Sequence, residues 1–223
     1  MANINPFVSN LINQGVLKTP RIIEAFEKID RADFVLLESR KNVYIDVPLP
    51  IGEGQTISQP YTVAFMIELL QPKSGDKIFE IGFGSGWQTV ILAHIVSQES
   101  QISNLKSQNL GRIYAVERIK ELFEFGAKNI STYNFIKKGI IKTILGDATT
   151  GLEKYAPFDG IIAAASGNKV PEAWLKELKI GGRLVMPIKE SIWLYIKKSA
   201  KEFEKQKFPG FVFVPLVSEK NRA

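Results

Sequence analysis

The sequence predicts an α/β protein built on a mostly parallel sheet. Short β-rich runs alternate with single helical patterns from Lys77 onward, which is typical of βαβ units. A glycine-rich loop follows the first of these runs, at the place where open α/β sheets bind ligands. The last two β-rich runs have no helical pattern between them, so they predict an antiparallel hairpin at one edge of the sheet.

Seven strands and three connecting helices are expected in this sheet. The parallel strands are expected at 78–81, 113–116, 141–145, 160–164 and 183–188, and the helices at 86–96, 120–133 and 171–178. The hairpin strands are expected at 191–196 and 211–217. The link 197–207, with five Lys and two Glu, is interpreted as a solvated hairpin turn rather than a nucleic-acid contact.

The first 70 residues predict helices and one ordered loop. Apolar residues recur at helical spacing in 5–13 and 20–29, with Thr19 as the N-cap of the second helix. The stretch 44–59 contains two prolines and two glycines, so it predicts an ordered loop or a short hairpin. An apolar helix is expected at 61–70, with Ser58 near its N-cap.

The composition is that of an ordinary globular chain, with 45% hydrophobic and 23% charged residues over 223 positions, and one domain is expected. The sequence has no Cys and a single His, which excludes disulfides, thiolate nucleophiles, Cys-ligated metals and His-rich metal sites. The net charge of +6 is spread along the chain and does not by itself indicate nucleic acid. No signal peptide or membrane-spanning apolar run is recognised, so a cytoplasmic protein is expected.

The segment 80–86, EIGFGSG, is the strongest local indication of a ligand site. Gly82, Gly84 and Gly86 allow the backbone to turn tightly and to expose helix N–H groups to a ligand, with Glu80 and Ser85 beside them. The spacing differs from the G-x-G-x-x-G of dinucleotide enzymes and from the P-loop pattern. A typical dinucleotide enzyme is therefore not indicated, and a P-loop NTPase is excluded.

Two further acids follow the next two strands. Glu117 ends the second strand, where its carboxylate is suited to accept both hydroxyls of a ribose. Asp147, followed by Ala148, ends the third strand and is suited to an adenine amino group. Glu117 lies further from the glycine loop than the usual spacing of about 20 residues, and a polar surface insertion at 97–109 accounts for most of the excess. Because the carboxyl ends of parallel strands meet at one rim, these acids and Glu80 are expected together.

Several segments are similar to a known enzyme family. The glycine loop and its acidic partners resemble those of class I S-adenosylmethionine-dependent methyltransferases. The segment 47–61, VPLPIGEGQTISQPY, resembles the signature block of protein-L-isoaspartate O-methyltransferases. The segments 157–162, 170–187 and 213–216 also resemble blocks of that family, so the similarity covers nearly the whole chain.

The resemblance implies a Rossmann-like class I methyltransferase fold, with 1–70 as N-terminal helices and substrate-side loop and 71–223 as the S-adenosylmethionine-binding core. It implies methylation of the free carboxylate of isoaspartyl residues in damaged proteins and peptides, which begins their repair. The enzyme is expected to be a monomer that uses no metal, nucleic acid or membrane. The predicted cofactor-binding residues are Ser58, Glu80, Gly82, Gly84, Ser85, Gly86, Glu117, Asp147 and Ala148.

Ser58 is the predicted catalytic residue. Carried over from the TIS part of the signature block, its hydroxyl is expected to hydrogen-bond the substrate carboxylate or the cofactor and to hold the geometry of attack. A carboxylate has a pKa of about 4 and is ionised at neutral pH, so no general base is needed. The alternative is that Ser58 only caps the helix that follows.

Two other functional classes stay open. One is a related peptide or small-molecule carboxyl methyltransferase, and the other is a protein that binds S-adenosylmethionine without transferring its methyl group. A nucleic-acid amino-methyltransferase is disfavoured, because 163–167 read AAASG where those enzymes have an Asp/Asn-Pro-Pro-aromatic motif. His94 and the three tryptophans, Trp87, Trp174 and Trp193, are interpreted as structural residues.

Overall fold

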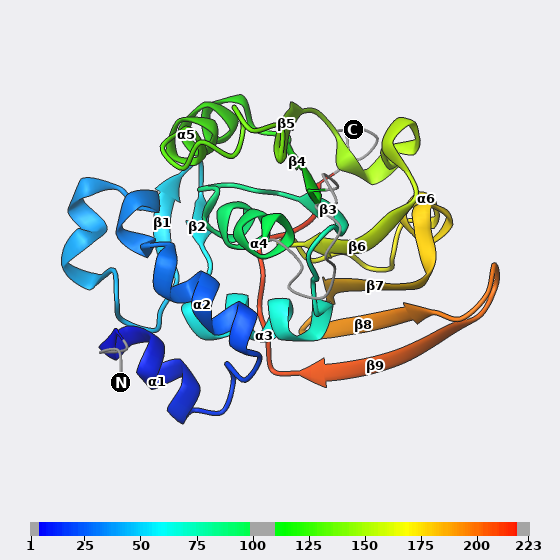
Figure 1. Cartoon of the computed structure of the whole chain (residues 1–223), viewed down its shortest axis with the longest axis horizontal. Helices are drawn as coiled ribbons and strands as arrows, with labels where there is room; N and C mark the ends of the chain where they lie inside the picture. The colour runs from blue at the N-terminus through cyan, green and yellow to red at the C-terminus, as the bar shows by residue number, and fades with distance from the viewer. Residues whose placement is uncertain (1–4, 99–109, 218–223) are drawn as a thin grey trace, which may run out of the picture.

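A seven-stranded sheet in the order β5-β4-β3-β6-β7-β8-β9 forms the centre of the structure (Figure 1). The structure is a computed structural model that describes residues 5–98 and 110–217. The first five strands in sequence are parallel, and β8 and β9 are antiparallel, which confirms the predicted sheet. The strands are β3 (Lys77–Ile81), β4 (Arg112–Glu117), β5 (Ile141–Leu145), β6 (Phe158–Ala163), β7 (Leu178–Ile188), β8 (Ser191–Lys197) and β9 (Phe203–Pro209).

The helices cover both faces of this sheet. Their bounds are α1 (Pro6–Asn13), α2 (Pro20–Lys28), α3 (Pro60–Leu70), α4 (Trp87–Ser97), α5 (Lys120–Ser131) and α6 (Glu172–Glu177). Proline stands at the first position of α1, α2 and α3, where its missing N–H has no intrahelical partner to lose. None of the helices in the described ranges is long and apolar enough to cross a lipid bilayer.

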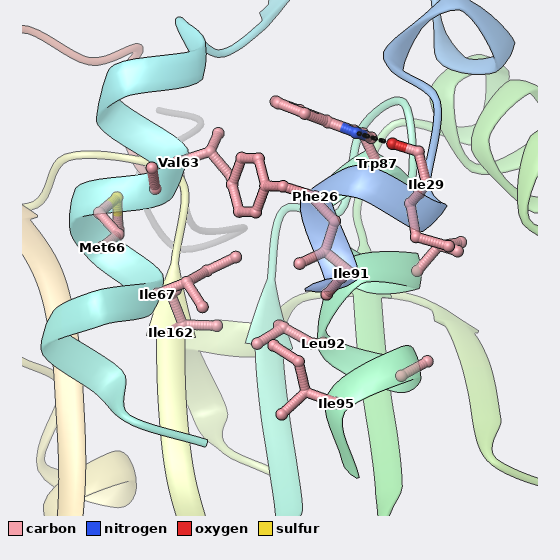
Figure 2. Close-up of a cluster of buried hydrophobic side chains, with 14 of the residues drawn as sticks. Phe26, Ile29, Val63, Met66, Ile67, Trp87, Ile91, Leu92, Ile95 and Ile162 are labelled. Atoms are coloured by element: carbon pink, nitrogen blue, oxygen red, sulfur yellow. Dashed lines mark hydrogen bonds between the residues drawn. The ribbon is translucent and has the colours of Figure 1, made fainter. Parts of the chain in front are cut away.

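One large hydrophobic cluster joins the N-terminal helices to the sheet (Figure 2). Phe26 of α2 packs edge-on against Trp87 of α4, with ring centroids 5.5 Å apart. Ile67 of α3 and Ile162 of β6 belong to the same cluster. The opposite face of the sheet carries a second cluster around Trp174 of α6. Because α2 and α3 share their core with the sheet, residues 5–70 pack as part of the same hydrophobic unit as the strands.

The tryptophans and His94 occupy packing positions. Trp87 and Trp174 are buried, in agreement with their predicted structural role, and Trp193 is half-buried on β8. His94 lies on α4 with its Nε2 3.5 Å from a carboxylate oxygen of Glu24 on α2.

Thr19 is the N-cap residue of α2 and Ser58 lies next to the N-cap of α3, as predicted, but neither side chain makes a capping hydrogen bond. Thr19 makes no capping hydrogen bond to α2, because its hydroxyl donates instead to Glu68 Oε2 at 2.7 Å. Helix α3 begins at Pro60 with Gln59 as N-cap, and Ser58 lies one residue before that cap. At Thr19 a distant carboxylate, that of Glu68, engages the hydroxyl, which helix propensity alone does not reveal.

The stretch 44–59 contains the hairpin that was one of its two predicted forms. β1 (Leu49–Gly52) pairs with β2 (Gln55–Ile57) in antiparallel fashion. The turn between them holds three consecutive residues with positive φ, Gly52, Glu53 and Gly54. This turn explains why glycines flank Glu53 in the sequence.

The last strand of the sheet differs from the prediction. β9 is formed by Phe203–Pro209, within and just beyond the charged link expected to be a turn, and not by residues 211–217. Lys205 Nζ lies 5.3 Å from the ring centroid of Tyr195, and Lys207 Nζ lies 5.8 Å from that of Trp193. An edge strand has one free side and exposed faces, so charged residues are tolerated there and protect it from pairing with other chains.

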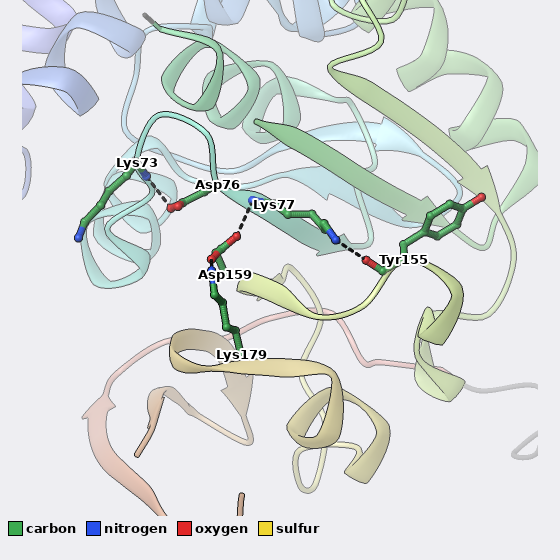
Figure 3. A network of polar contacts seen from close by, with 6 residues as sticks. All are labelled: Lys73, Asp76, Lys77, Tyr155, Asp159 and Lys179. Carbon is green, nitrogen blue, oxygen red and sulfur yellow. Dashed lines mark hydrogen bonds and ion pairs between the residues drawn. The ribbon is translucent and has the colours of Figure 1, made fainter. Parts of the chain in front are cut away.

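A network of hydrogen bonds and one ion pair joins the amino ends of β3, β6 and β7 to one another (Figure 3). The Asp159 carboxylate accepts hydrogen bonds from Lys77 N at 3.0 Å and from Lys179 Nζ at 2.7 Å. Lys77 Nζ donates to Tyr155 O at 3.0 Å, and Asp76 accepts from Lys73 N. These contacts lie at the end of the sheet opposite to the carboxyl ends of the strands, where ligands bind in this fold class.

Candidate active site

A pocket of about 440 Å³ opens at the carboxyl ends of the parallel strands. Ile81 pairs with Val116 and Ala163, and Glu117 pairs with Leu145, so the ends of β3, β4, β5 and β6 lie side by side. The pocket has the size of a typical small-molecule site. Its lining comes mainly from the β1–β2 hairpin and Ser58, the glycine loop, the ends of β4, β5 and β6, and the segment 212–217, with Thr62 of α3 and Leu122 of α5.

The glycine loop forms one wall of the pocket through Gly82 and Gly84. Gly84 has a φ of 49°, and a Cβ there would lie 3.3 Å from Ile51 Cδ1 of the hairpin. Gly86 has a φ of 87°, and a Cβ there would lie 2.6 Å from Ile130 Cγ1 of α5. Gly84 therefore allows the substrate-side hairpin to approach the loop, whereas Gly86 allows α5 to pack against it.

Glu117 is held by three backbone N–H groups. Its Oε1 accepts from Arg118 N at 2.7 Å and Ile119 N at 2.9 Å, and its Oε2 accepts from Gly84 N at 3.1 Å. The side chain is only 7% exposed and lines the pocket. Glu117 thus lies beside the glycine loop, as predicted, and also fixes that loop to the start of α5.

Asp147 and Ala148 line the same pocket at the end of β5. Asp147 Oδ1 accepts from Thr149 N at 2.8 Å, which caps the short 3₁₀ helix at Ala148–Thr150. Ala148 O accepts from Trp174 Nε1 at 2.8 Å, so the backbone at this point is anchored to α6.

Glu80 and Ser85 face a separate cavity of about 40 Å³ behind the glycine loop. Glu80 is fully buried, and its Oε1 accepts from Gln88 Nε2 at 3.0 Å. Burial raises the pKa of Glu80 to about 7. Among the predicted cofactor residues, Glu80, Ser85 and Gly86 do not line the larger pocket. Their predicted contact with the cofactor stays a prediction.

Ser58 lines both the larger pocket and the smaller cavity, at the junction of hairpin and glycine loop. The helix-capping role that was its alternative belongs to another residue, because Asp46 Oδ1 accepts from Tyr61 N at 2.8 Å. Asp46 Oδ2 also accepts from Gln59 Nε2 at 3.2 Å. Within the described residues, the Ser58 hydroxyl makes no hydrogen bond and is available to a ligand.

Three parts of the site were missed by sequence reasoning. Arg31 and Asp46 hold the hairpin and the start of α3, and neither stands in a motif with a recognised chemical role. The segment 212–217, expected as a strand, instead passes over the pocket, where Ser166 N donates to Val214 O and Leu216 N donates to Ser166 O, both at 2.8 Å. Its continuous apolar run, VFVPLV, was the available signal, but such a run does not distinguish a strand from an extended pocket wall.

The residues present fit S-adenosylmethionine. A glycine loop that a ligand can approach closely, a buried acid at the next strand end and a second acid at the following strand end converge on one pocket of suitable volume. The sheet order and this site define the class I S-adenosylmethionine-dependent methyltransferases.

Comparison with known proteins identifies the family within that class. The protein-L-isoaspartate(D-aspartate) O-methyltransferase (PCMT) family matches residues 2–221. A protein-L-isoaspartate O-methyltransferase from Flavobacterium psychrophilum is 40% identical over 97% of this chain and 95% of its own length. One from Methanopyrus kandleri is 37% identical over 95% of this chain and 90% of its own length.

A solved structure is similar over the same extent. The crystal structure of a Plasmodium falciparum beta-aspartate methyltransferase in complex with S-adenosyl-L-homocysteine superposes with a TM-score of 0.82 at 25% identity. The match covers 97% of this chain and 99% of that one. This chain belongs to the protein-L-isoaspartate(D-aspartate) O-methyltransferase family.

Proposed function

We propose that this chain methylates the free carboxylate of isoaspartyl residues in damaged proteins and peptides and so begins their repair. The observation that carries this proposal is the position of Ser58. It places a hydroxyl from the TIS block in the same pocket as the glycine loop and Glu117. A carboxylate bound at Ser58 would therefore lie next to the methyl donor.

The cofactor half of the pocket is assigned to residues at the strand ends. Gly82, Gly84, Glu117, Asp147 and Ala148 would hold S-adenosylmethionine, which supplies an electrophilic methyl group when bound. Glu80, Ser85 and Gly86 would support the loop from behind, because they lie on its far side or against α5. Glu117 would act in both ways, since it contacts the Gly84 N–H and faces the pocket.

The substrate half needs alignment rather than acid–base chemistry. An isoaspartyl carboxylate is ionised at neutral pH, so the chain's residues have only to bring its oxygen into line with the methyl group. Holding two reactants in this way is worth roughly 7–11 kcal/mol of the barrier. Ser58 would provide the hydrogen bond that orients the carboxylate, and the hairpin and the segment 212–217 would border the peptide on either side.

We infer that the chain acts as a monomer on isoaspartyl-containing proteins and peptides in the cytoplasm, without metal, nucleic acid or membrane. In the described ranges there is no cluster of three or more side chains suited to hold a metal ion.

A labelled-methyl assay tests the proposal. The purified, chelator-treated protein is incubated with S-adenosylmethionine and an isoaspartyl peptide, and the matched control is the same peptide with normal aspartate. We expect base-labile label on the isoaspartyl peptide only. Cofactor binding without transfer to any carboxylate would instead identify a non-catalytic binding protein, and transfer to small carboxylic acids alone would identify another carboxyl methyltransferase.

A further inference from the structure

Arg31 is a buried arginine that bonds backbone carbonyls in two separate segments. It opens the short 3₁₀ helix Arg31–Phe34 and is only 1% exposed. Its Nη1 donates to Val43 O at 2.6 Å, and its Nη2 donates to Val47 O at 3.0 Å and to Ser58 O at 3.1 Å. In the described part of the chain it has no salt bridge to a carboxylate.

The environment of Arg31 makes its burial costly. Desolvation lowers the pKa of Arg31 to about 10, and only the charge of nearby Asp46 opposes this effect. The group is still a cation at neutral pH. It lies 5.4 Å from the ring centroid of Trp87, the first residue of α4, and Trp87 Nε1 in turn lies 3.5 Å from Ile29 O. Burying the Arg31 charge among backbone carbonyls and one aromatic ring costs free energy of folding. What Arg31 provides in return is a fixed position for the carbonyl groups that it binds.

The carbonyls that Arg31 binds flank the β1–β2 hairpin on both sides. Val43 and Val47 precede the hairpin, and Ser58 follows it directly. The guanidinium therefore ties the two ends of the hairpin together, and residues of this hairpin line the pocket. Asp46, which caps α3 through Tyr61 N, lies inside the tied segment.

We propose that Arg31 is a positioning residue for Ser58. The planar guanidinium of Arg31 donates to the Ser58 carbonyl and to carbonyls of the segment 43–47 at the same time. It thereby fixes the position of the Ser58 hydroxyl relative to the glycine loop. Arg31 does not line the pocket, so it acts through the backbone and not by touching the substrate. The proposal rests on the role of Ser58 given under the proposed function.

The test compares Arg31→Lys with Arg21→Lys. A lysine ammonium keeps the charge but not the planar fork, so it cannot bond the same carbonyls in the same geometry. Arg21 is a matched control, because it also joins an N-terminal helix to the chain beyond α3, through Pro72 O at 2.7 Å and Gln71 Oε1 at 2.8 Å. Neither Arg21 nor its partners line the pocket.

Two measurements are made on the full-length protein. Hydrogen exchange is followed at the amides of residues 49–58, and kcat and KM are determined with the isoaspartyl peptide at a temperature where the variant is folded. We expect Arg31→Lys to speed exchange in 49–58 at least tenfold. We also expect it to lower kcat/KM by about 10- to 100-fold, the effect of a displacement of about 1 Å in a reacting group. The dissociation constant for S-adenosylhomocysteine should change less than about threefold, and Arg21→Lys should leave all three values near those of the wild type.

A double-mutant cycle separates this role from general stabilisation. In a Ser58→Ala background, Arg31→Lys should lower kcat/KM much less than in the wild type, because the group that it positions is already gone. Fully additive effects, or unchanged exchange in 49–58, would overturn the proposal. If Arg31→Lys does not fold, Arg31→Gln, which removes the buried charge and keeps an amide donor, takes its place.

The exchange measurement does not depend on activity. If the wild type fails to methylate the isoaspartyl peptide, the proposed function is wrong, while exchange still decides whether Arg31 holds the hairpin. If Ser58→Ala keeps the wild-type kcat/KM but Arg31→Lys lowers it, Ser58 does not bind the substrate carboxylate. The proposal that Arg31 acts by positioning Ser58 is then also wrong.

Discussion

Ser58 has a hydroxyl that is free for a ligand, because Asp46 performs the helix capping next to it. We therefore expect Ser58→Ala to reduce kcat/KM for an isoaspartyl peptide by about 10- to 150-fold. This corresponds to the loss of one hydrogen bond to a charged group, worth about 1.5–3 kcal/mol. The melting temperature should stay close to that of the wild type. A variant that melts earlier yet turns over normally would contradict the assignment.

Asp46→Ala should show the complementary behaviour. It removes the acceptor for Tyr61 N at the start of α3, and loss of a helix cap typically lowers the free energy of unfolding by about 1 kcal/mol. Urea unfolding of Asp46→Ala and Ser58→Ala side by side provides the measurement. Equal destabilisation by both substitutions would show that the capping role is shared.

Glu117→Ala should weaken binding of S-adenosylhomocysteine by about 1.5–3 kcal/mol, the range for hydrogen bonds to a charged group. The carboxylate also accepts three backbone N–H groups, so the substitution loosens the link between the glycine loop and α5. Calorimetry on the variant checks the affinity, and unfolding in urea checks the loss of these bonds. An unchanged dissociation constant would show that Glu117 serves the loop alone.

Individual site residues were predictable where a motif or a strand end marked them. Ser58, Gly82, Gly84, Glu117, Asp147 and Ala148 do come together in one pocket. Glu80 belongs to the same strand end but points behind the loop, and the direction of a single side chain at a strand end depends on register. Arg31 was not predictable, because its partners are backbone carbonyls and leave no mark on the residue types around them.

The strand β9 lies at the edge of the sheet and is mostly exposed. Its Lys205 and Lys207 lie on the free edge of the sheet over Tyr195 and Trp193. We expect the double substitution Lys205→Val, Lys207→Val to promote concentration-dependent association, because it leaves an apolar, unpaired edge. Sedimentation velocity at several concentrations provides the measurement, with Lys120→Val, at an exposed position of α5, as the control for lost charge. An unchanged sedimentation profile would show that other features protect this edge.

Most buried strands and helices were predicted at nearly their observed positions, since their apolar residues report directly on burial. β7 is an exception, because it begins at Leu178 and not at Arg183 as predicted, and its first residues, 179–181, are exposed. β9 was missed because an edge strand buries little, so its sequence resembles a solvated loop. The insertion expected at 97–109 lies, from residue 99 onward, outside the described residues.

The stability of the whole molecule should depend on pH through Glu80. Burial raises its pKa to about 7 in the folded protein, above the ordinary value of 4.5. Between these values the folded state holds a proton that the unfolded chain has released, so this contribution is present at low pH and is lost as pH rises towards 7. Relative to Glu80→Gln, the wild type should lose roughly 3 kcal/mol of unfolding free energy between pH 4.5 and 8. Urea titrations of both proteins across this range test the difference, which should vanish if Glu80 is ionised throughout.

The polar network at the amino ends of the strands has a consequence for the chemical ageing of the chain. Asp159-Gly160 is the only Asp-Gly pair in the sequence, and this dipeptide is where an aspartate most readily closes onto the following amide to form a succinimide. To do so, Asp159 would have to leave both Lys77 N and Lys179 Nζ, and Gly160 would have to leave its place between Ile78 and Arg183 in the ladder. The folded protein thus holds the Asp159-Gly160 linkage in a geometry that hinders succinimide formation. A member of a family that acts on isoaspartate is in this way protected by its own fold from becoming its own substrate.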